Sequence, residues 1–288
     1  MTRAHRILSK ADRDGTTRHI APALERGDIE LISDRRSRFA WNPGEDLAPS
    51  GDDDTPMPPP APRESSPPVA ARPVFGATLD KDMVAALQPF SPAAEQYRTL
   101  RTRIAQVESA GQRRVILVTS PGDGDGKTVT VANLALTMAQ EFQRHVLLID
   151  ADLRNARLHE CLGIPREPGL SDVLAGQASL DDALVSLSEY RVIVLPAGSP
   201  HGRPTELLSS EPMRRLVENL GRRFDRVVID STAAHFADAG VLEPLVDGVL
   251  LVVRAGRTAR PAVARALGLV PRAKLLGLVL NESRAASR

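Results

Sequence analysis

A glycine-rich loop between an apolar run and a helix-like run constrains this chain more than any other feature. The loop spans residues 118–128 and reads VTSPGDGDGKT, with apolar residues at 115–118 before it and a helical pattern at 129–139 after it. Glycine lets the backbone turn so that successive N–H groups point inward and cradle phosphate oxygens, and the following helix adds the positive end of its dipole. The pattern therefore predicts a site for the phosphates of a nucleotide.

Each position of the loop has an expected role, although the loop is a variant. The strict P-loop pattern, G-x-x-x-x-G-K-[ST], requires glycine at 121, where this chain has Pro121. We expect Lys127 to reach the β- and γ-phosphates of ATP and the hydroxyl of Thr128 to bind Mg²⁺. Because Asp123 and Asp125 lie where phosphate would be, their side chains should point to solvent, a metal or protein. The alternative is a glycine-rich turn without a ligand. The expected nucleotide-binding residues of the loop are Gly122, Asp123, Gly124, Asp125, Gly126, Lys127, Thr128 and Val129.

Short apolar runs alternate with helix-like stretches after residue 113. The runs lack polar alternation, which is typical of parallel strands buried on both faces. Strands that alternate with helices indicate a three-layer α/β/α fold around a mostly parallel sheet. The expected strands are residues 115–118, 146–149, 192–195, 227–229, 249–253 and 275–280, and the expected helices are 128–142, 205–223 and 260–270.

Three acidic residues follow two of the expected strands. Asp150 and Asp152 come just after the run at 146–149, and Asp230 ends the run at 227–229. Ligands of parallel α/β sheets bind at the carboxyl ends of the strands. An extended backbone would point Asp150 and Asp152 the same way, so that one holds Mg²⁺ through water and the other accepts a proton, in either order. Asp230 would orient the water shell of Mg²⁺; the alternative for each acid is a helix N-cap. The expected metal site is Thr128, Asp150 and Asp230, and the expected catalytic set is Lys127, Asp150, Asp152 and Asp230.

The chain divides into three segments. Residues 1–42 contain only short apolar stretches and predict a low-order segment that either stays disordered or folds on a partner. Residues 43–75 predict an extended, proline-rich and acidic linker, since ten prolines fall between Pro43 and Pro73. Residues 76–288 form the expected P-loop domain.

Composition excludes several classes of function. The chain has 37 basic and 36 acidic residues, so it lacks the basic field that wraps nucleic acid. Cys161 is the one cysteine, so an internal disulfide framework is excluded and a reducing compartment fits. No apolar run approaches the roughly 20 residues that span a bilayer. We expect a soluble cytoplasmic protein that reaches a membrane only through a partner.

A further helix is expected ahead of the first strand. Ser91 suits an N-cap and Pro92 the first helical position. Glu95, Arg98 and Arg101 recur at intervals of three, which without other information indicates a solvated, ion-paired face. An apolar stripe at helical spacing consists of Tyr97, Leu100, Ile104 and Val107.

Across residues 90–284 the chain resembles the bacterial tyrosine kinase family, the cytoplasmic ATPases of capsular and exopolysaccharide assembly. The resemblance rests on the phosphate loop and on the segments 148–154, 228–231, 169–176, 195–198, 246–253, 95–101 and 277–281. It implies transfer of the ATP γ-phosphoryl group to tyrosine, with a membrane-embedded chain-length regulator as activating partner and recruitment to the inner face of the membrane. It implies also that residues 90–109 form an oligomerisation helix through Glu95, Arg98 and Arg101, giving a homo-oligomer, and that Asn281 lies near the adenine.

The chain departs from that family in its tyrosines. Only Tyr97 and Tyr190 are present, and the last residues, 281–288, contain none, so the family's C-terminal tyrosine cluster is missing. After Asp230 and Ser231 the usual prolines are replaced by Thr232 and Ala233. Two functions therefore remain open: a kinase that acts in trans, or an ATP-switched assembly subunit that phosphorylates nothing. A ParA/MinD-like positioning ATPase is a third alternative, although the signature lysine of its loop would fall at Gly122.

Overall fold

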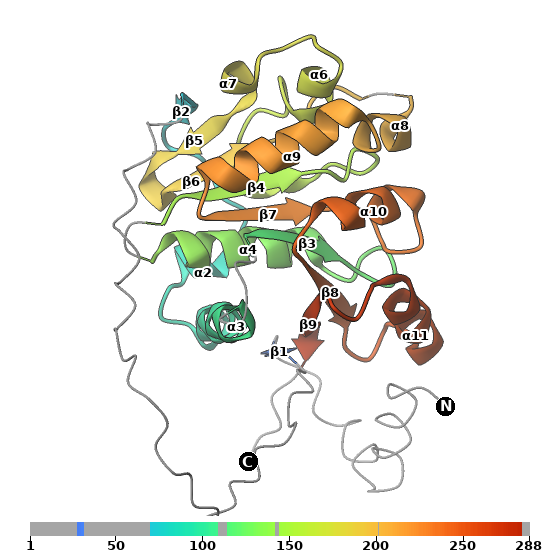
Figure 1. Ribbon diagram of the computed structural model, residues 1–288. Helices are drawn as coiled ribbons and strands as arrows, with labels where there is room; N and C mark the ends of the chain where they lie inside the picture. Colours follow the sequence, from blue (N-terminus) through green and yellow to red (C-terminus); the bar gives the residue numbers. More distant parts are fainter. Residues whose placement is uncertain (1–27, 32–69, 109–113, 142–143, 201, 284–288) are drawn as a thin grey trace, which may run out of the picture.

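A mostly parallel sheet forms the centre of the molecule. A computed structural model of the chain describes residues 28–31, 70–108, 114–141, 144–200 and 202–283 (Figure 1). Within these residues nine strands form one sheet in the order β1-β9-β8-β3-β7-β4-β6-β5-β2, and the six from β9 to β6 run parallel. The six are β3 Val115–Thr119, β4 Val146–Asp150, β6 Val192–Leu195, β7 Arg226–Asp230, β8 Gly248–Arg254 and β9 Leu275–Ser283. The expected α/β fold is confirmed.

Helices cover both faces of the sheet and so complete three layers (Figure 1). One face packs against α3 (Pro92–Glu108) and α4 (Lys127–Ala139), and the other against α9 (Glu211–Arg223). Leu148 lies in the hydrophobic core on the side of α3 and α4, and Leu147 lies in the core on the side of α9. Both side chains are fully buried. Burial of each such side chain contributes about 1.5–3 kcal/mol, which explains why these strands are apolar on both faces. None of the helices in the described part of the chain is both long and apolar enough to cross a bilayer.

The remaining helices are short. They are α2 Val84–Leu87, α5 Leu158–Leu162, α6 Leu170–Leu174, α7 Leu180–Ala183, α8 Pro204–Leu208, α10 Ala237–Leu242 and α11 Arg260–Leu269, with 3₁₀ turns at Ser188–Tyr190 and Glu243–Leu245. The expected helix at 205–223 is wrong as a single element, because α8 and α9 are separate. The hydroxyl of Ser210 accepts a hydrogen bond from the N–H of Met213 at 3.3 Å and so starts a new helix, in which proline occupies the first turn.

The N-terminus of helix α3 lies where the sequence predicted it. The hydroxyl of Ser91 accepts a hydrogen bond from the N–H of Ala94 at 3.1 Å, which confirms the expected N-cap. Tyr97, Leu100 and Ile104 are buried, as the apolar stripe predicts. This stripe packs α3 onto α4 and fixes the helix to the body of the domain.

Short edge strands lie in segments for which the sequence predicted no order. Strand β2 (Arg72–Val74) falls at the end of the expected linker and pairs in parallel with β5 (Val185–Leu187), which was not predicted either. Pro73 is tolerated because an edge strand needs no donor on its outer side. Strand β1 (Asp28–Leu31) falls within the expected low-order segment and pairs antiparallel with β9. Residues 1–27 and 32–69 of these segments lie outside the described residues.

Candidate nucleotide-binding site

The glycine-rich loop joins β3 to α4 at the carboxyl edge of the sheet (Figure 1). Gly124 and Gly126 have positive φ angles of 77° and 90°, a conformation that other residues rarely adopt. The hydroxyl of Ser120 donates to the carbonyl oxygen of Gly122 at 2.5 Å, so the turn closes around the buried Pro121. Proline at the variant position therefore leaves a folded loop ahead of α4.

The two acids of the loop have different surroundings. Asp125 is buried, and its carboxylate accepts from the N–H of Gly122 at 3.1 Å and from the hydroxyl of Thr258 at 2.7 Å. Asp123 is 60% exposed and lies 4.0 Å from Nζ of Lys127, which is itself buried. Asp125 thus binds other protein groups and stabilises the loop, whereas Asp123 faces solvent. Both orientations were among those expected for acidic side chains beside a phosphate.

The ends of β8 and β9 hold the loop from the neighbouring side. Nδ2 of Asn281 donates to the carbonyl oxygen of Asp125 at 3.0 Å, and a Cβ atom at Gly126 would lie 2.0 Å from the same nitrogen. Nη1 of Arg254 donates to the carbonyl oxygen of Gly124 at 3.2 Å. Asn281 was expected near the adenine, and the structure places its side chain against the loop itself. Its contact with a base stays a prediction.

Arg254 and Thr258 were missed by the sequence analysis. Arg254 also pairs with Glu282 at 2.6 Å, and its N–H donates to the hydroxyl of Thr258 at 3.0 Å. A signal did exist, since Arg254 is the last residue of a buried strand and so lies at the edge of the sheet where ligands bind. The order of the strands could not be predicted from the sequence, and it is this order that places β8 directly beside β3.

Asp150 is fully buried, and its side chain binds backbone N–H groups of nearby residues. Its carboxylate accepts from the N–H of Asp152 and from the N–H of Leu158, both at 3.2 Å. Burial, followed by the neighbouring charge of Asp230, raises the pKa of Asp150 well above its ordinary value. The bond to the residue two positions on ties the carboxylate of Asp150 to the backbone that carries Asp152. That the two carboxylates point the same way stays a prediction. The helix-capping alternative is met in part, since Leu158 begins α5.

Asp230 has a carboxylate without a partner. It lies opposite Asp150 in the register of β7 and β4, and both of its oxygens are buried and accept no hydrogen bond from the described residues. Burial raises the pKa of Asp230 to about 7, although the nearby Thr128 and Lys127 oppose that rise. A buried carboxylate of this kind requires a cationic or hydrogen-bonding partner. A hydrated Mg²⁺ ion fits, because Thr128 and Asp230 both present the hard oxygen atoms that Mg²⁺ prefers.

Asp152 is the more accessible of the two acids after β4. It is 6% exposed as a residue, whereas Asp150 is completely covered. One of its oxygens accepts from the N–H of Asn155 at 3.0 Å. Burial raises the pKa of Asp152, and the positive charge of Lys127 opposes this effect. An acid with a raised pKa next to a lysine is a suitable general base.

An ion pair between an exposed arginine and a buried aspartate lies at the rim of the site. Nε and Nη2 of Arg154 bind the carboxylate of Asp238 at 2.5 and 3.2 Å, and Thr205 hydrogen-bonds to both residues. The guanidinium also lies 5.8 Å from the ring centre of Phe236. These contacts tie the loop after β4 to α8 and α10, so they fix the wall beside Asp152.

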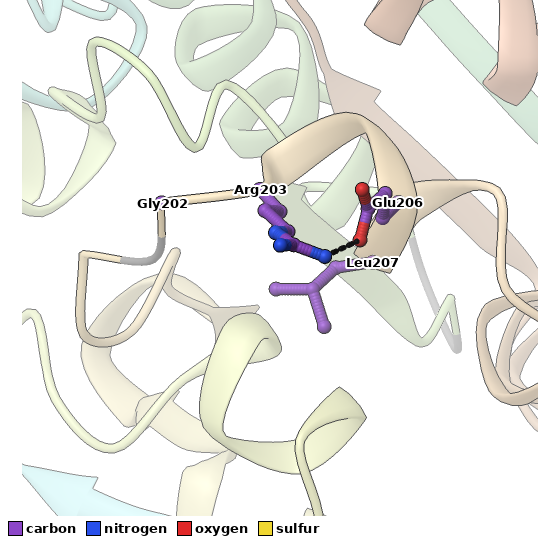
Figure 2. A pocket seen from close by; sticks show the side chains of 4 residues that line it. All are labelled: Gly202, Arg203, Glu206 and Leu207. Carbon is purple, nitrogen blue, oxygen red and sulfur yellow. Dashed lines mark hydrogen bonds and ion pairs between the residues drawn. The ribbon is translucent and has the colours of Figure 1, made fainter.

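Two surface hollows lie apart from the phosphate loop. One, on α8, is lined by Gly202, Arg203, Glu206 and Leu207, and Figure 2 shows the ion pair between Arg203 and Glu206 at 3.2 Å. The other is lined by residues of the outer face of α3: Glu95, Arg98, Thr99, Arg101, Thr102, Arg103 and Gln106. Neither hollow contains an expected nucleotide-binding residue.

The expected oligomerisation residues make contacts within their own chain. Arg98 binds Glu95 at 2.7 Å. Arg101 donates to the carbonyl oxygen of Thr137 at 2.9 Å and pairs with Glu141 at 3.2 Å. The bonds of Arg101 fasten α3 to the end of α4. A role of these residues between subunits stays a prediction.

The fold and the site together define a class. A glycine-rich loop between a parallel strand and a helix, followed by lysine and threonine and flanked by acids at strand ends, defines a P-loop nucleotide-binding protein. The family model "CobQ/CobB/MinD/ParA nucleotide binding domain" matches residues 116–286, which agrees with this class.

Known proteins narrow the class further. The chain is 35% identical over 216 residues to tyrosine-protein kinase YwqD of Bacillus subtilis (strain 168), covering 74% of this chain and 91% of YwqD. It is 36% identical over 201 residues to the succinoglycan biosynthesis transport protein ExoP of Rhizobium meliloti (strain 1021), covering 68% of this chain and 25% of ExoP. The kinase domain of Escherichia coli tyrosine kinase ETK superposes with a TM-score of 0.68 at 30% identity, covering 72% of this chain and 82% of that domain. The chain belongs to the bacterial tyrosine-protein kinase family of P-loop proteins.

Proposed function

We propose that the protein binds Mg·ATP and transfers its γ-phosphoryl group to a tyrosine of another protein. The observation that carries the proposal is the unpartnered, buried carboxylate of Asp230 beside Lys127 and Thr128 at the end of the glycine-rich loop. The backbone N–H groups of the loop and the N-terminus of α4 bind the phosphates, and Lys127 neutralises charge on the β- and γ-phosphates.

Thr128 and Asp230 hold the cation in this proposal. When bound, Mg²⁺ neutralises the negative charge that develops between the β- and γ-phosphates. Asp150 takes a different part from the one expected, since backbone N–H groups occupy its carboxylate. It holds the backbone that carries Asp152.

Asp152 is the general base in this proposal, and its exposure relative to Asp150 supports the choice. Its carboxylate takes the proton of the acceptor hydroxyl as the oxygen of that hydroxyl bonds to the γ-phosphorus. The bond from the γ-phosphorus to the bridging oxygen breaks, and ADP leaves with the electron pair. Phosphotyrosine and ADP are the products.

The acceptor belongs to another molecule. Tyr97 is buried, and burial raises its pKa far above the ordinary value, so it is a poor nucleophile in the folded chain. Tyr190 is half-buried at the end of a 3₁₀ turn. Because the chain has no third tyrosine, the proposal places the acceptor on another protein.

The relatives support a place in polysaccharide export. ExoP is named a succinoglycan biosynthesis transport protein, and this chain matches about a quarter of it. We propose that a membrane-embedded chain-length regulator activates the protein and recruits it from the cytoplasm to the inner face of the membrane. Assembly into a homo-oligomer through α3 belongs to the same proposal.

A second candidate is an ATP-switched assembly subunit that hydrolyses ATP slowly and phosphorylates nothing. The burial of Tyr97 and the partial burial of Tyr190 favour it. In this case ATP changes the shape or the self-association of the protein, and transfer to tyrosine is absent.

One experiment separates the two. Purified protein is incubated with Mg·ATP and a tyrosine-rich peptide. The release of inorganic phosphate is measured in solution, and phosphotyrosine is measured by mass spectrometry. Lys127→Met is compared with Lys81→Met, a matched change at an exposed lysine. Phosphotyrosine that depends on Lys127 supports the kinase. Phosphate release without phosphotyrosine, in the presence of membrane fractions that supply an activator, supports the switch. If Lys127→Met retains full turnover, the site itself is misassigned.

A further inference from the structure

Two consecutive carbonyl groups of the phosphate loop are bound by side chains from the strands β8 and β9. The carbonyl oxygen of Gly124 accepts from Nη1 of Arg254 at 3.2 Å, and that of Asp125 accepts from Nδ2 of Asn281 at 3.0 Å. Arg254 ends β8, Asn281 lies near the end of β9, and the two residues are partners in the register of these strands. Both donors therefore come from the same edge of the sheet.

These two hydrogen bonds fix the direction of two N–H groups. The peptide bonds of the loop are trans, and in a planar trans peptide the C=O group and the N–H group of the next residue point in opposite directions. Because the carbonyl oxygens of Gly124 and Asp125 face the two donors, the N–H groups of Asp125 and Gly126 point away from them. Among the described residues, neither of these N–H groups donates a hydrogen bond. Successive N–H groups of this kind form a cradle that binds phosphate.

Asn281 is itself held in place by its neighbours. Its Oδ1 accepts from the N–H of Glu282 at 3.0 Å, and its carbonyl oxygen accepts from the N–H of Ala255 at 2.9 Å. Glu282 has a φ angle of 56°, which is uncommon for a residue other than glycine, and its carboxylate pairs with Arg254 at 2.6 Å. Such a backbone conformation persists where the surrounding contacts hold it, and it is frequent at ligand sites. The amide of Asn281 therefore approaches the loop in a fixed orientation.

We infer that Asn281 is a positioning residue that orients the phosphate loop toward the phosphates of the nucleotide and does not recognise its base. This inference rests on the proposed function, since it requires a nucleotide in the loop. Arg254 orients the preceding peptide group in the same way. A loop that already has its binding conformation loses less freedom when the ligand binds, so affinity falls when the orienting bonds are removed. The contacts that depend on this orientation are those to the phosphates, so the effect is the same for any nucleoside triphosphate.

The experiment compares three ligands that share a triphosphate: Mg·ATP, Mg·GTP and inorganic tripolyphosphate with Mg²⁺. Isothermal titration calorimetry gives the dissociation constant of each ligand for the full-length protein, at a temperature well below the thermal unfolding midpoint measured for each variant. Asn281→Ala removes a neutral donor, so it changes no charge near the phosphates. Arg254→Lys keeps the positive charge and removes the planar fork that reaches Gly124 and Glu282 together. Asn219→Ala, at an exposed position of α9, is the matched control.

We expect Asn281→Ala to weaken the binding of all three ligands by a common factor of about 3- to 10-fold, which corresponds to the net value of one hydrogen bond. Arg254→Lys should also weaken all three by a common factor, and Asn219→Ala should leave each dissociation constant unchanged. The ratio of the dissociation constants for ATP and GTP should therefore be that of wild type in every variant.

Two results overturn the inference. A loss confined to ATP, with tripolyphosphate bound as tightly as by wild type, would show that Asn281 recognises the base. Unchanged dissociation constants in Asn281→Ala, with or without a lower unfolding midpoint, would show that its bond to Asp125 serves the fold alone.

Failure of the proposed function has a different signature. Wild type would then bind none of the three ligands, or Lys127→Met would bind them as tightly as wild type. In either case the phosphate site itself is misassigned, and the inference fails with it. If wild type binds the ligands but forms no phosphotyrosine, the kinase proposal fails, and the dissociation constants still decide the role of Asn281.

Discussion

Nδ2 of Asn281 donates a hydrogen bond to the carbonyl oxygen of Asp125 at 3.0 Å, across a separation of 156 positions in the chain. The last parallel strand of the sheet thus closes the phosphate loop that follows its second neighbour, β3. Since the same nitrogen stands where a side chain at Gly126 would have to lie, the glycine and the asparagine are linked in their effect on stability.

The link between Gly126 and Asn281 gives the first prediction. Gly126→Ala should lower the free energy of unfolding by about 2 kcal/mol or more, since alanine is strained at a φ of 90° and its Cβ would meet Asn281. Asn281→Ala should cost about 1 kcal/mol, the net value of one hydrogen bond. The double variant should be more stable than the sum of both losses by about 1 kcal/mol, because the clash is gone. Urea unfolding of all four proteins measures this coupling, and strict additivity would contradict it.

Lys127→Met gives the second prediction. ATP turnover should fall by at least about 100-fold, because the site loses its main positive charge toward the phosphates. The thermal unfolding midpoint of the nucleotide-free protein should change little, since removing the buried charge of Lys127 offsets the loss of its attraction to the buried Asp152 and Asp230. Calorimetry and a phosphate-release assay on the same preparation test both parts. A large drop of the midpoint would mean that the lysine serves the fold.

The central strands could be predicted because their signal is local. The run at 146–149 is apolar at successive positions, and burial on both faces requires that composition wherever the strand lies in the sheet. Strands β2 and β5 have three residues each, and their stability comes from a partner strand. A stretch that short carries no periodicity from which a strand can be recognised.

The site was predictable to the extent that it is a motif. The positions of Lys127, Thr128 and the acid of β7 follow from chemistry that is local in the chain. The contacts of Arg254 with Gly124 and of Arg154 with Asp238 span 130 and 84 positions, so they depend on strand order and on loop paths. That both carboxylate oxygens of Asp230 are buried is a property of packing, which no pattern of residue types contains.

His159 gives a prediction on pH. Burial lowers the pKa of His159 below its ordinary value, so the unfolded chain binds more protons there than the folded chain. The contribution of His159 to stability is therefore fully present above about pH 6.5 and is lost as the pH falls below that value through the lower pKa of the folded chain. The difference in unfolding free energy between wild type and His159→Asn should rise from pH 5 to pH 7 and then level off. Urea titrations with His235→Asn as an exposed control measure it, and a flat difference would contradict it.

The ion pair of Arg154 and Asp238 gives a prediction on charge burial. Arg154→Met should lower the free energy of unfolding by about 2 kcal/mol, less than for a fully buried pair because Arg154 is 40% exposed while Asp238 is covered. The loss arises mainly from the carboxylate left without its cation. Adding Asp238→Asn should therefore restore part of the stability. Chemical unfolding of the single and double variants tests this, and a double variant less stable than Arg154→Met would show that the cost has another source.

Arg98 and Arg101 give a prediction on assembly that separates contacts within the chain from contacts between chains. Arg98 pairs with Glu95, where an ion pair adds a few tenths of a kcal/mol, and donates to the carbonyl oxygen of Pro89. Arg98→Glu should therefore lower the unfolding midpoint only slightly. Arg101 binds Thr137 and Glu141 on α4, so Arg101→Glu should lower the midpoint as well. Both changes should reduce the mass of the particle in Mg·ATP if α3 joins subunits. Arg222→Glu, a charge reversal on helix α9 across the sheet, should leave that mass unchanged. Light scattering measures the particle mass of the three variants and of wild type. Equal masses for wild type and Arg98→Glu would contradict a contact between subunits through α3.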